Sequence, residues 1–157
     1  MKDIKITIKL NGEDFTGYTE PGESLLNFLR DHHFYDVKCG CAMGDCGTCT
    51  LLFNGKAVKS CLLLAAQADG GEVLTVKGLT AQDTVGIMLA EEFIACGSVQ
   101  CGFCIPGMIA AGKHYIAEGG TADRKAIRRA ISGNLCRCTG YNKIVDAIYN
   151  VAAQVNQ

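Results

Sequence analysis

Apolar and polar residues alternate over the first ten residues of the chain, which is the period of a half-buried β-strand. The apolar positions of this run are Ile4, Ile6, Ile8 and Leu10. An Asn-Gly pair, the strongest short hairpin signal, occurs at residues 11–12 and again at 54–55. The strands predicted by these patterns are Ile4–Leu10, Glu13–Tyr18, Thr50–Phe53, Lys56–Ser60 and Glu72–Lys77. Ser24–Asp31 has apolar residues at helical spacing, so the first half reads as strands around one helix.

After Gly78 the alternation gives way to helical spacing. The predicted helices are Val85–Ile94, Gly107–Ala117, Asp123–Ile131 and Lys143–Val155. Pro106 can open the second of these at its first turn, and Gly133 stops the third. Four helices with short connections favour a helical bundle. We therefore expect an α+β fold with a small strand-rich domain over residues 1–78 and a four-helix-bundle-like domain over residues 79–157.

Composition and charge exclude several classes of protein. The formal net charge of the 157 residues is −1, and the sequence has no concentrated basic patch, so we do not expect nucleic-acid binding. No apolar run approaches the length of a membrane span. The first ten residues, MKDIKITIKL, lack the unbroken apolar core of a signal peptide, so the expected location is the cytoplasm.

The chain contains ten cysteines. In a cytoplasmic protein, clustered cysteines are more often metal ligands than disulfide partners. Their positions are 39, 41, 46, 49, 61, 96, 101, 104, 136 and 138. They fall into two groups, with Cys96 as an outlier beside the second. This distribution predicts two metal sites, one in each domain.

The first group lies in VKCGCAMGDCGTC, residues 37–49. Cys41, Cys46 and Cys49, followed by Cys61 after eleven further residues, have the C-x4-C-x2-C…C spacing of a plant-type [2Fe-2S] ferredoxin loop. Two irons bridged by two sulfides need four thiolates, and backbone N–H groups stabilise the negative charge of the cluster. The glycines at 40, 44 and 47 allow the loop to turn its amides inward. A hairpin returns its end close to its start, which makes Cys61 a sensible fourth ligand.

Spacing alone leaves two alternatives open for this loop. Cys39 and Cys41 form a C-x-C pair, so Cys39, Cys41, Cys46 and Cys49 could make a self-contained site. Zinc also takes four cysteines, but its usual pattern is two C-x2–4-C knuckles, and the x4-x2 loop with three glycines fits that pattern poorly.

The second group is Cys101 and Cys104, then a gap of thirty-one residues, then Cys136 and Cys138. This spacing is not that of a plant-type ferredoxin, and taken alone it could belong to a zinc site. A helical bundle can gather these four thiolates where its helix ends meet. Helix N-termini that point at the site would help to hold negative charge.

The motifs QCGFCIPG and GNLCRCTGY, preceded by GDCGTCTLLFNGKAVKSCL, closely resemble the small iron–sulfur subunit or domain of the molybdenum hydroxylases. This family includes xanthine dehydrogenase, aldehyde oxidoreductase and carbon monoxide dehydrogenase relatives, and the resemblance covers nearly the whole chain. It implies a ferredoxin-like β-grasp domain followed by a four-helix domain, each with one [2Fe-2S] cluster. The implied ligands are Cys41, Cys46, Cys49 and Cys61 for the first cluster and Cys101, Cys104, Cys136 and Cys138 for the second.

The resemblance also implies a route for electrons. A large subunit would hold molybdopterin and hydroxylate the substrate, and electrons would pass through the C-terminal cluster and then the N-terminal cluster, usually to FAD on a third subunit. In this family Cys138 and Gln100 would lie beside the pterin. The chain would then be an oxidoreductase subunit that performs no bond chemistry itself, and would set the potentials of two redox centres. Among possible substrates of the complex we favour xanthine, another purine or another N-heterocycle.

Three positions depart from the usual pattern of the family, namely Cys39, Cys96 and Ile105, and none of them removes an implied ligand. We interpret Cys39 and Cys96 as small buried apolar residues. The three histidines are interpreted as surface residues. Four basic residues of the third predicted helix form either a solvated face or a docking face for an acidic partner; they are Arg124, Lys125, Arg128 and Arg129.

Two other functions remain as alternatives at this point. A free-standing electron carrier would use the same clusters with an exposed docking face in place of a large permanent interface. A zinc-stabilised interaction module would use the same cysteines without redox chemistry.

Overall fold

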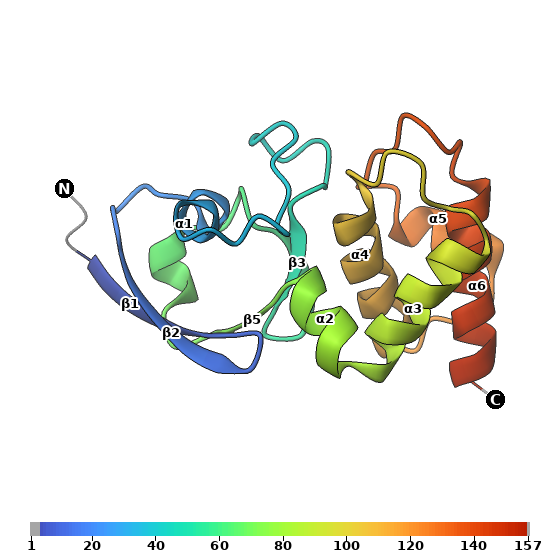
Figure 1. Cartoon of the computed structure of the whole chain (residues 1–157), viewed down its shortest axis with the longest axis horizontal. Helices are drawn as coiled ribbons and strands as arrows, with labels where there is room; N and C mark the ends of the chain where they lie inside the picture. The colour runs from blue at the N-terminus through green and yellow to red at the C-terminus, as the bar shows by residue number, and fades with distance from the viewer. Residues whose placement is uncertain (1–3, 157) are drawn as a thin grey trace.

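The computed structural model describes residues 4–156, as a strand-rich half and a helical half that lie side by side (Figure 1). The start of β1 (Ile4–Leu10) and the end of α6 (Asn142–Val155) lie at opposite ends of the molecule (Figure 1). The α+β class predicted from the sequence is confirmed. None of the helices among the described residues has the length and apolar character needed to cross a bilayer.

The strand-rich half is a five-stranded sheet in the order β2-β1-β5-β3-β4. Its strands are β1 (Ile4–Leu10), β2 (Glu13–Thr19), β3 (Thr50–Phe53), β4 (Lys56–Lys59) and β5 (Glu72–Leu74). Both predicted hairpins form, because β1 pairs with β2 and β3 pairs with β4 in antiparallel register. Strand β5 lies between β1, which it meets in parallel, and β3, which it meets in antiparallel orientation.

Helix α1 (Leu25–Asp31) covers one face of this sheet. Ser24 caps its first turn by accepting a hydrogen bond from Asn27 N at 3.2 Å. Its apolar side packs into a core with the inward residues of β1, so that Leu25, Leu29 and Ile8 are fully buried together. A short 3₁₀ helix, η1 (Ala65–Ala68), closes the same core and was not predicted from the sequence.

The helical half contains α2 (Val76–Gln82), α3 (Thr84–Ala95), α4 (Ile105–Ala117), α5 (Arg124–Ala130) and α6 (Asn142–Val155). The last four correspond to the predicted helices, with ends that differ by at most two residues. Their apolar faces form one core, which also contains Leu52 from β3. The two halves therefore pack against each other through side chains and are not joined by the chain alone.

The first residues of α2 were predicted wrongly. The pattern indicated a strand through Lys77, but β5 ends at Leu74 and a helix begins at Val76. The Asn11 side chain explains the change, because its Oδ1 accepts a hydrogen bond from Thr75 N at 2.9 Å. Leu79 then turns into the helical core. The expected domain boundary between residues 78 and 79 falls inside α2, and it remains a proposal.

Candidate metal centres

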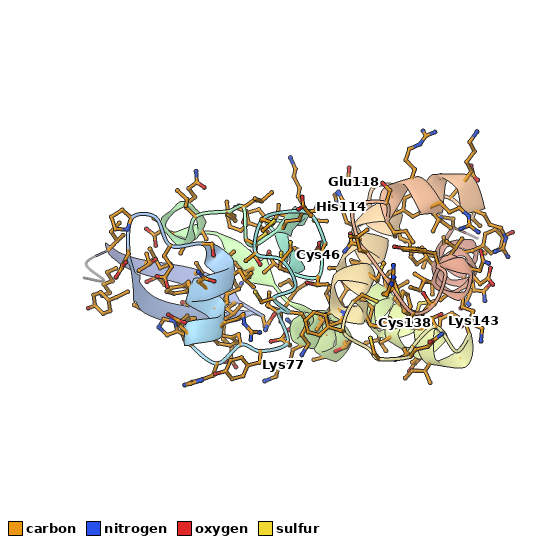
Figure 2. All side chains as sticks on the ribbon, turned by 90° about the horizontal axis from the view of Figure 1, so that it is seen from above. Cys46, Lys77, His114, Glu118, Cys138 and Lys143 are labelled. Atoms are coloured by element: carbon orange, nitrogen blue, oxygen red, sulfur yellow. The ribbon has the colours of Figure 1, made fainter. Side chains whose placement is uncertain are left out.

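The first cysteine loop runs from the end of α1 to the start of β3, at the edge of the strand-rich half that faces the helices. It lies on the same side of the molecule, the top in Figure 1, as the connections that carry the second cysteine group. Figure 2 shows Cys46 in the middle of the molecule and Cys138 on the helical half.

Backbone amides of the first loop point at the sulfur of Cys41. Met43 N and Cys46 N lie 3.5 and 3.4 Å from Cys41 Sγ. These amide groups, that of Met43 first, lower the pKa of Cys41 to about 6, because they stabilise the thiolate. A loop that already solvates one thiolate with its own N–H groups suits an anionic iron–sulfur centre.

Cys61 is brought to this loop by the second hairpin. Ser60, which directly follows β4, donates from its backbone N and its Oγ to Cys49 O at 3.3 and 2.9 Å. Burial, followed by the neighbouring thiols of Cys49 and Cys41, raises the pKa of Cys61 to about 11. The structure therefore brings Cys61 beside the cysteines of the loop, across a long stretch of sequence.

Cys39 differs from the four other cysteines of this group. Its side chain is exposed, whereas Cys49 is buried and Cys41, Cys46 and Cys61 are half-buried. The interpretation of Cys39 as a small buried apolar residue is therefore wrong. Next to it, Gly40 has no room for a side chain, because a Cβ there would lie 2.8 Å from Cys46 Sγ. The loop backbone at Gly40 therefore packs closely on the Cys46 side chain, whereas the Cys39 side chain is exposed to solvent.

The second group of cysteines is gathered by three helix ends. Cys101 and Cys104 precede α4, and Cys136 and Cys138 lie between α5 and α6. Cys138 Sγ lies 3.7 Å from Cys101 Sγ, and both side chains are exposed. Burial, followed by the neighbouring Cys136 and Cys101 thiols, raises the pKa of Cys104 to about 12. The set thus has an inner, less exposed pair, Cys104 and Cys136, and an outer pair.

Thr139 and Tyr141 position Cys136, and sequence reasoning assigned no role to either. Burial opposes the ionisation of Cys136, but hydrogen bonds from Thr139, the Cys138 backbone and the Cys104 thiol together outweigh it, so the pKa of Cys136 is lowered. Thr139 Oγ1 lies 3.1 Å from Cys136 Sγ. Tyr141 adopts a left-handed backbone with φ of 68° before α6, and its phenol accepts a hydrogen bond from Cys136 N at 2.9 Å. A tyrosine directly after glycine was the only hint in the sequence.

Gln100 is exposed, directly before the exposed Cys101. Its neighbours Val99 and Phe103 are large apolar side chains that are also exposed. This corner of the helical half is therefore open to a partner. Contact of Gln100 and Cys138 with a pterin remains a proposal.

The chemical groups at both sites are those that bind iron–sulfur clusters. Each site offers four thiols, and the first also offers inward-pointing amides. Within residues 4–156, no group of three or more His, Cys, Asp and Glu side chains is arranged to hold a single metal ion. A two-iron cluster distributes its four thiolates over two metal atoms, so its ligands do not converge on one point.

A cavity of about 470 Å³ lies between the two halves, beside β4 and α4. Its lining includes Lys59, His114, Glu118 and Asn134. Lys59 Nζ is already bonded to Gly44 O at 2.6 Å, whereas the buried Nδ1 of His114 has no hydrogen-bond partner among the described residues. His114 is half-buried, so the interpretation of this histidine as a surface residue is wrong.

The basic helix α5 is exposed on its charged side, and two of its arginines have partners within the helical half. Arg124 pairs with Asp146 and lies 4.7 Å from the ring centre of Tyr149. Arg128 donates to Asn142 Oδ1 at 2.7 Å. These contacts tie α5 to α6 and favour a structural role for both arginines.

Two protein families match the chain. Residues 8–80 match the family described as "2Fe-2S iron-sulfur cluster binding domain", and residues 75–149 match the family described as "[2Fe-2S] binding domain". The presence of both in one chain supports two [2Fe-2S] clusters, one for each cysteine group.

Relatives are similar over nearly their whole length. The nicotinate dehydrogenase small FeS subunit of Eubacterium barkeri is 44% identical over 94% of this chain and 94% of its own. The xanthine dehydrogenase iron-sulfur-binding subunit of Escherichia coli O157:H7 is 40% identical over 92% of each chain. The crystal structure of quinoline 2-oxidoreductase from Pseudomonas putida 86 contains a chain that is 39% identical, with a TM-score of 0.89 over 97% of this chain and 95% of that one. Matched folds, two cluster-binding families and these relatives lead to one conclusion: the chain belongs to the small [2Fe-2S] iron–sulfur subunits of the molybdenum hydroxylase family.

Proposed function

We propose that this chain carries electrons from a molybdopterin centre on a large partner subunit, through its two [2Fe-2S] clusters, to FAD on a further subunit. The ligands in this proposal are Cys101, Cys104, Cys136 and Cys138 for the entry cluster and Cys41, Cys46, Cys49 and Cys61 for the exit cluster. When bound, the molybdopterin centre supplies the substrate oxidation and releases electrons. All ten thiols are free of disulfides, which fits a complex that works in the reducing cytoplasm.

One observation carries this proposal above the others: the second cysteine set has an exposed pair and a less exposed pair. Cys101 and Cys138 are exposed, whereas Cys104 is buried and Cys136 is half-buried. Leu135, directly before Cys136, donates its backbone N–H to Cys46 O of the first loop at 2.8 Å. A redox partner that contacts Cys138 would therefore meet the outer sulfurs. The inner sulfurs then lead toward the other cluster. Gln100 is exposed at the same corner and is suited to hydrogen-bond a cofactor held by the partner.

The first loop offers a corresponding exit. Met43 and Leu62 are 68% and 66% exposed, and Leu62 lies against Gly44 in the loop. Exposed apolar side chains of this size beside a redox centre are suited to burial in a protein interface. We assign this surface to the subunit that accepts the electrons, with FAD as its cofactor.

The names of the relatives support an N-heterocyclic substrate for the complex. Nicotinate, xanthine and quinoline, which appear in those names, are all nitrogen-containing aromatic rings. Substrate choice rests with the large subunit, so for this chain the proposal concerns the complex as a whole.

The test is purification of the native complex under anaerobic conditions through a tag on this chain. We expect co-elution of a molybdenum-containing subunit and of flavin, and two distinct EPR signals from reduced clusters. Nicotinate, xanthine and quinoline are then compared with an aldehyde as electron donors. A chain that elutes alone would overturn the subunit role, and zinc in place of iron and sulfide would overturn electron transfer itself.

A further inference from the structure

A lysine at the edge of the sheet contacts the backbone of the first cysteine loop. Lys59 is the last residue of β4 and is half-buried, and its Nζ donates a hydrogen bond to Gly44 O at 2.6 Å. A hydrogen bond from an ammonium group is charge-assisted, so it is stronger than one between neutral groups. Gly44 lies between the proposed ligands Cys41 and Cys46. A positive charge is therefore held against the loop that would surround the N-terminal cluster.

The peptide groups on both sides of Gly44 carry N–H groups that face ligand sulfurs. The N–H of Gly44 is hydrogen-bonded to the thiol of Cys61, and the N–H of Asp45 to that of Cys41. The carbonyl of Gly44 and the N–H of Asp45 belong to one peptide group. The ammonium of Lys59 at the carbonyl end therefore polarises the N–H at the other end, because hydrogen bonds in a chain strengthen one another. A chain of polar groups thus connects Lys59 Nζ to Cys41 Sγ.

The surrounding fold keeps Lys59 in this position. The hairpin register places Lys59 opposite Thr50, the first residue of β3. Gly44 has φ of +92°, and a Cβ there would lie 2.8 Å from Leu62 Cδ1, so the turn that presents its carbonyl requires glycine. On the side of the helical half, a Cβ on Gly133 would lie 3.6 Å from Lys59 Nζ. The sheet, the loop and the helical half together therefore fix where the ammonium lies.

The charge of Lys59 is not neutralised by a carboxylate. Within residues 4–156, no Asp or Glu side chain makes an ion pair with Lys59. Asp45, the acidic residue of the loop, is exposed. Water and salt weaken the field of an exposed charge more than that of a half-buried one. The first loop is therefore left with a net positive field from Lys59.

We propose that Lys59 is a positioning residue that raises the reduction potential of the N-terminal cluster, through its own charge and through the peptide group that it polarises. The inference rests on the function proposed above. In the step concerned, one electron leaves the C-terminal cluster, which is oxidised, and reduces one iron of the N-terminal cluster, while no proton moves and no covalent bond changes. The added negative charge is stabilised by the ammonium, so the electron favours the exit cluster.

The test is an EPR-monitored redox titration of the native complex with both clusters. The signal of the N-terminal cluster is identified by its loss in Cys61→Ala. Lys59→Gln removes the charge and keeps a hydrogen-bond donor. It should shift the equilibrium of the electron away from the N-terminal cluster by about tenfold, which corresponds to about 59 mV for one electron. The potential of the C-terminal cluster should change less, because the polarised N–H faces Cys41.

Lys56→Gln is the matched control, since Lys56 is exposed at the other end of β4 and its loss changes the net charge equally. It should leave both potentials close to those of the wild type. Lys59→Arg keeps a charged donor and should restore the wild-type potential. Lys59→Met removes the donor as well and should lower the potential further, and Lys59→Gln carries the test if Lys59→Met cannot hold the cluster.

A lowered potential of the N-terminal cluster in Lys59→Gln, restored in Lys59→Arg and absent from Lys56→Gln, would support the role of Lys59. A wild-type potential in Lys59→Gln would overturn it, and so would an equal shift in Lys56→Gln or a value in Lys59→Arg as low as that in Lys59→Gln. Failure of the proposed function is a separate result, because it would be the absence of two [2Fe-2S] signals from the wild-type complex.

Discussion

Cys39 and Cys61 are the two candidates for the fourth ligand of the first site. Their surroundings in the structure differ. Cys61 lies close enough to the loop to be a ligand, because Ser60 Oγ donates a hydrogen bond to Cys49 O and the thiols of Cys61 and Cys49 are neighbours. Cys39 is exposed at the open end of the loop. Two residues that look equivalent in the sequence therefore have different surroundings in the fold.

Cys61→Ala should abolish the EPR signal of the N-terminal cluster and leave that of the C-terminal cluster, since one iron would lose a thiolate. Cys39→Ala, the control, should keep both signals. EPR of the reduced proteins and iron analysis provide the measurement. Loss of the signal in Cys39→Ala with retention in Cys61→Ala would assign the site to the loop alone.

The thiol of Cys96 should react slowly with iodoacetamide at neutral pH. Burial, then the hydrogen bond to Glu92 Oε1 at 3.3 Å and the charge of that residue, raise the pKa of Cys96. A raised pKa means that the reactive thiolate forms only as the pH rises toward that higher value. Glu92→Gln should therefore speed alkylation of Cys96 severalfold at a fixed pH near 8, as followed by mass spectrometry.

Glu91→Gln is the control for this measurement, because Glu91 is the neighbouring carboxylate on an exposed position of the same helix. Equal alkylation rates in wild type, Glu91→Gln and Glu92→Gln would show that Glu92 has no influence on the thiol.

Among the helices, α3 depends on a residue that serves two partners at once. Asp83 Oδ1 accepts a hydrogen bond from Gly86 N at 2.8 Å, which caps the first turn. Asp83 Oδ2 pairs with Lys113 Nζ of α4 at 2.8 Å. One side chain thus starts a helix and fastens it to its neighbour.

Asp83→Ala should lower the free energy of unfolding by about 1–2 kcal/mol, because the cap is lost and Lys113 loses its partner. Asp83→Asn should lose less, since asparagine is an equally good cap and only the ion pair is removed. Urea denaturation of the cluster-loaded protein measures both. A larger loss in Asp83→Asn than in Asp83→Ala would contradict the capping role.

Elements with a strong local signal were predictable from the sequence, and elements defined by distant contacts were not. The Asn-Gly turns and the period-2 run set β1 to β4 within one or two residues, because their register depends on neighbouring residues. Helix α2 was missed because it begins after a contact with a distant residue: Asn11, more than sixty residues earlier, accepts a hydrogen bond from Thr75 N, directly after β5. The cysteine groups were evident from spacing, whereas the hydrogen bond from Asn134 Nδ2 to Gly47 O could not be predicted, since the two residues belong to different halves of the chain.

At the scale of the whole molecule, both cysteine groups lie in connections that contain little regular structure. Their backbone amides point at sulfur, as with Met43 N and Cys41 Sγ, and Asn134 bridges them. The sheet and the helices have two apolar cores, of which the helical one also contains Leu52 of β3, and these loops add further contacts between the halves. Cluster binding should therefore stabilise the contact between the halves more than either core.

Removal of the clusters should lower the thermal unfolding temperature and raise hydrogen exchange most in residues 39–49 and 133–141, because the cluster binding energy contributes to folding. Exchange in β1 and in the middle of α6 should change least. Hydrogen exchange with mass spectrometry, before and after anaerobic reconstitution, tests this. Uniform loosening across the chain would show that the clusters support both cores equally.

One part of the contact between the halves is made by backbone alone: a Cβ on Gly47 would lie 2.3 Å from Gly133 O, and a Cβ on Gly107 would lie 2.5 Å from Gly47 O. At these positions no side chain is present that could adapt to a half taken from another protein. Exchange of residues 1–78 for the equivalent segment of a relative should succeed only when the incoming loop keeps glycine at position 47, and the recipient should keep glycine at 107 for the same reason. The two halves are therefore expected to have been inherited together, as a matched pair, even though each would read as a separate unit in the sequence.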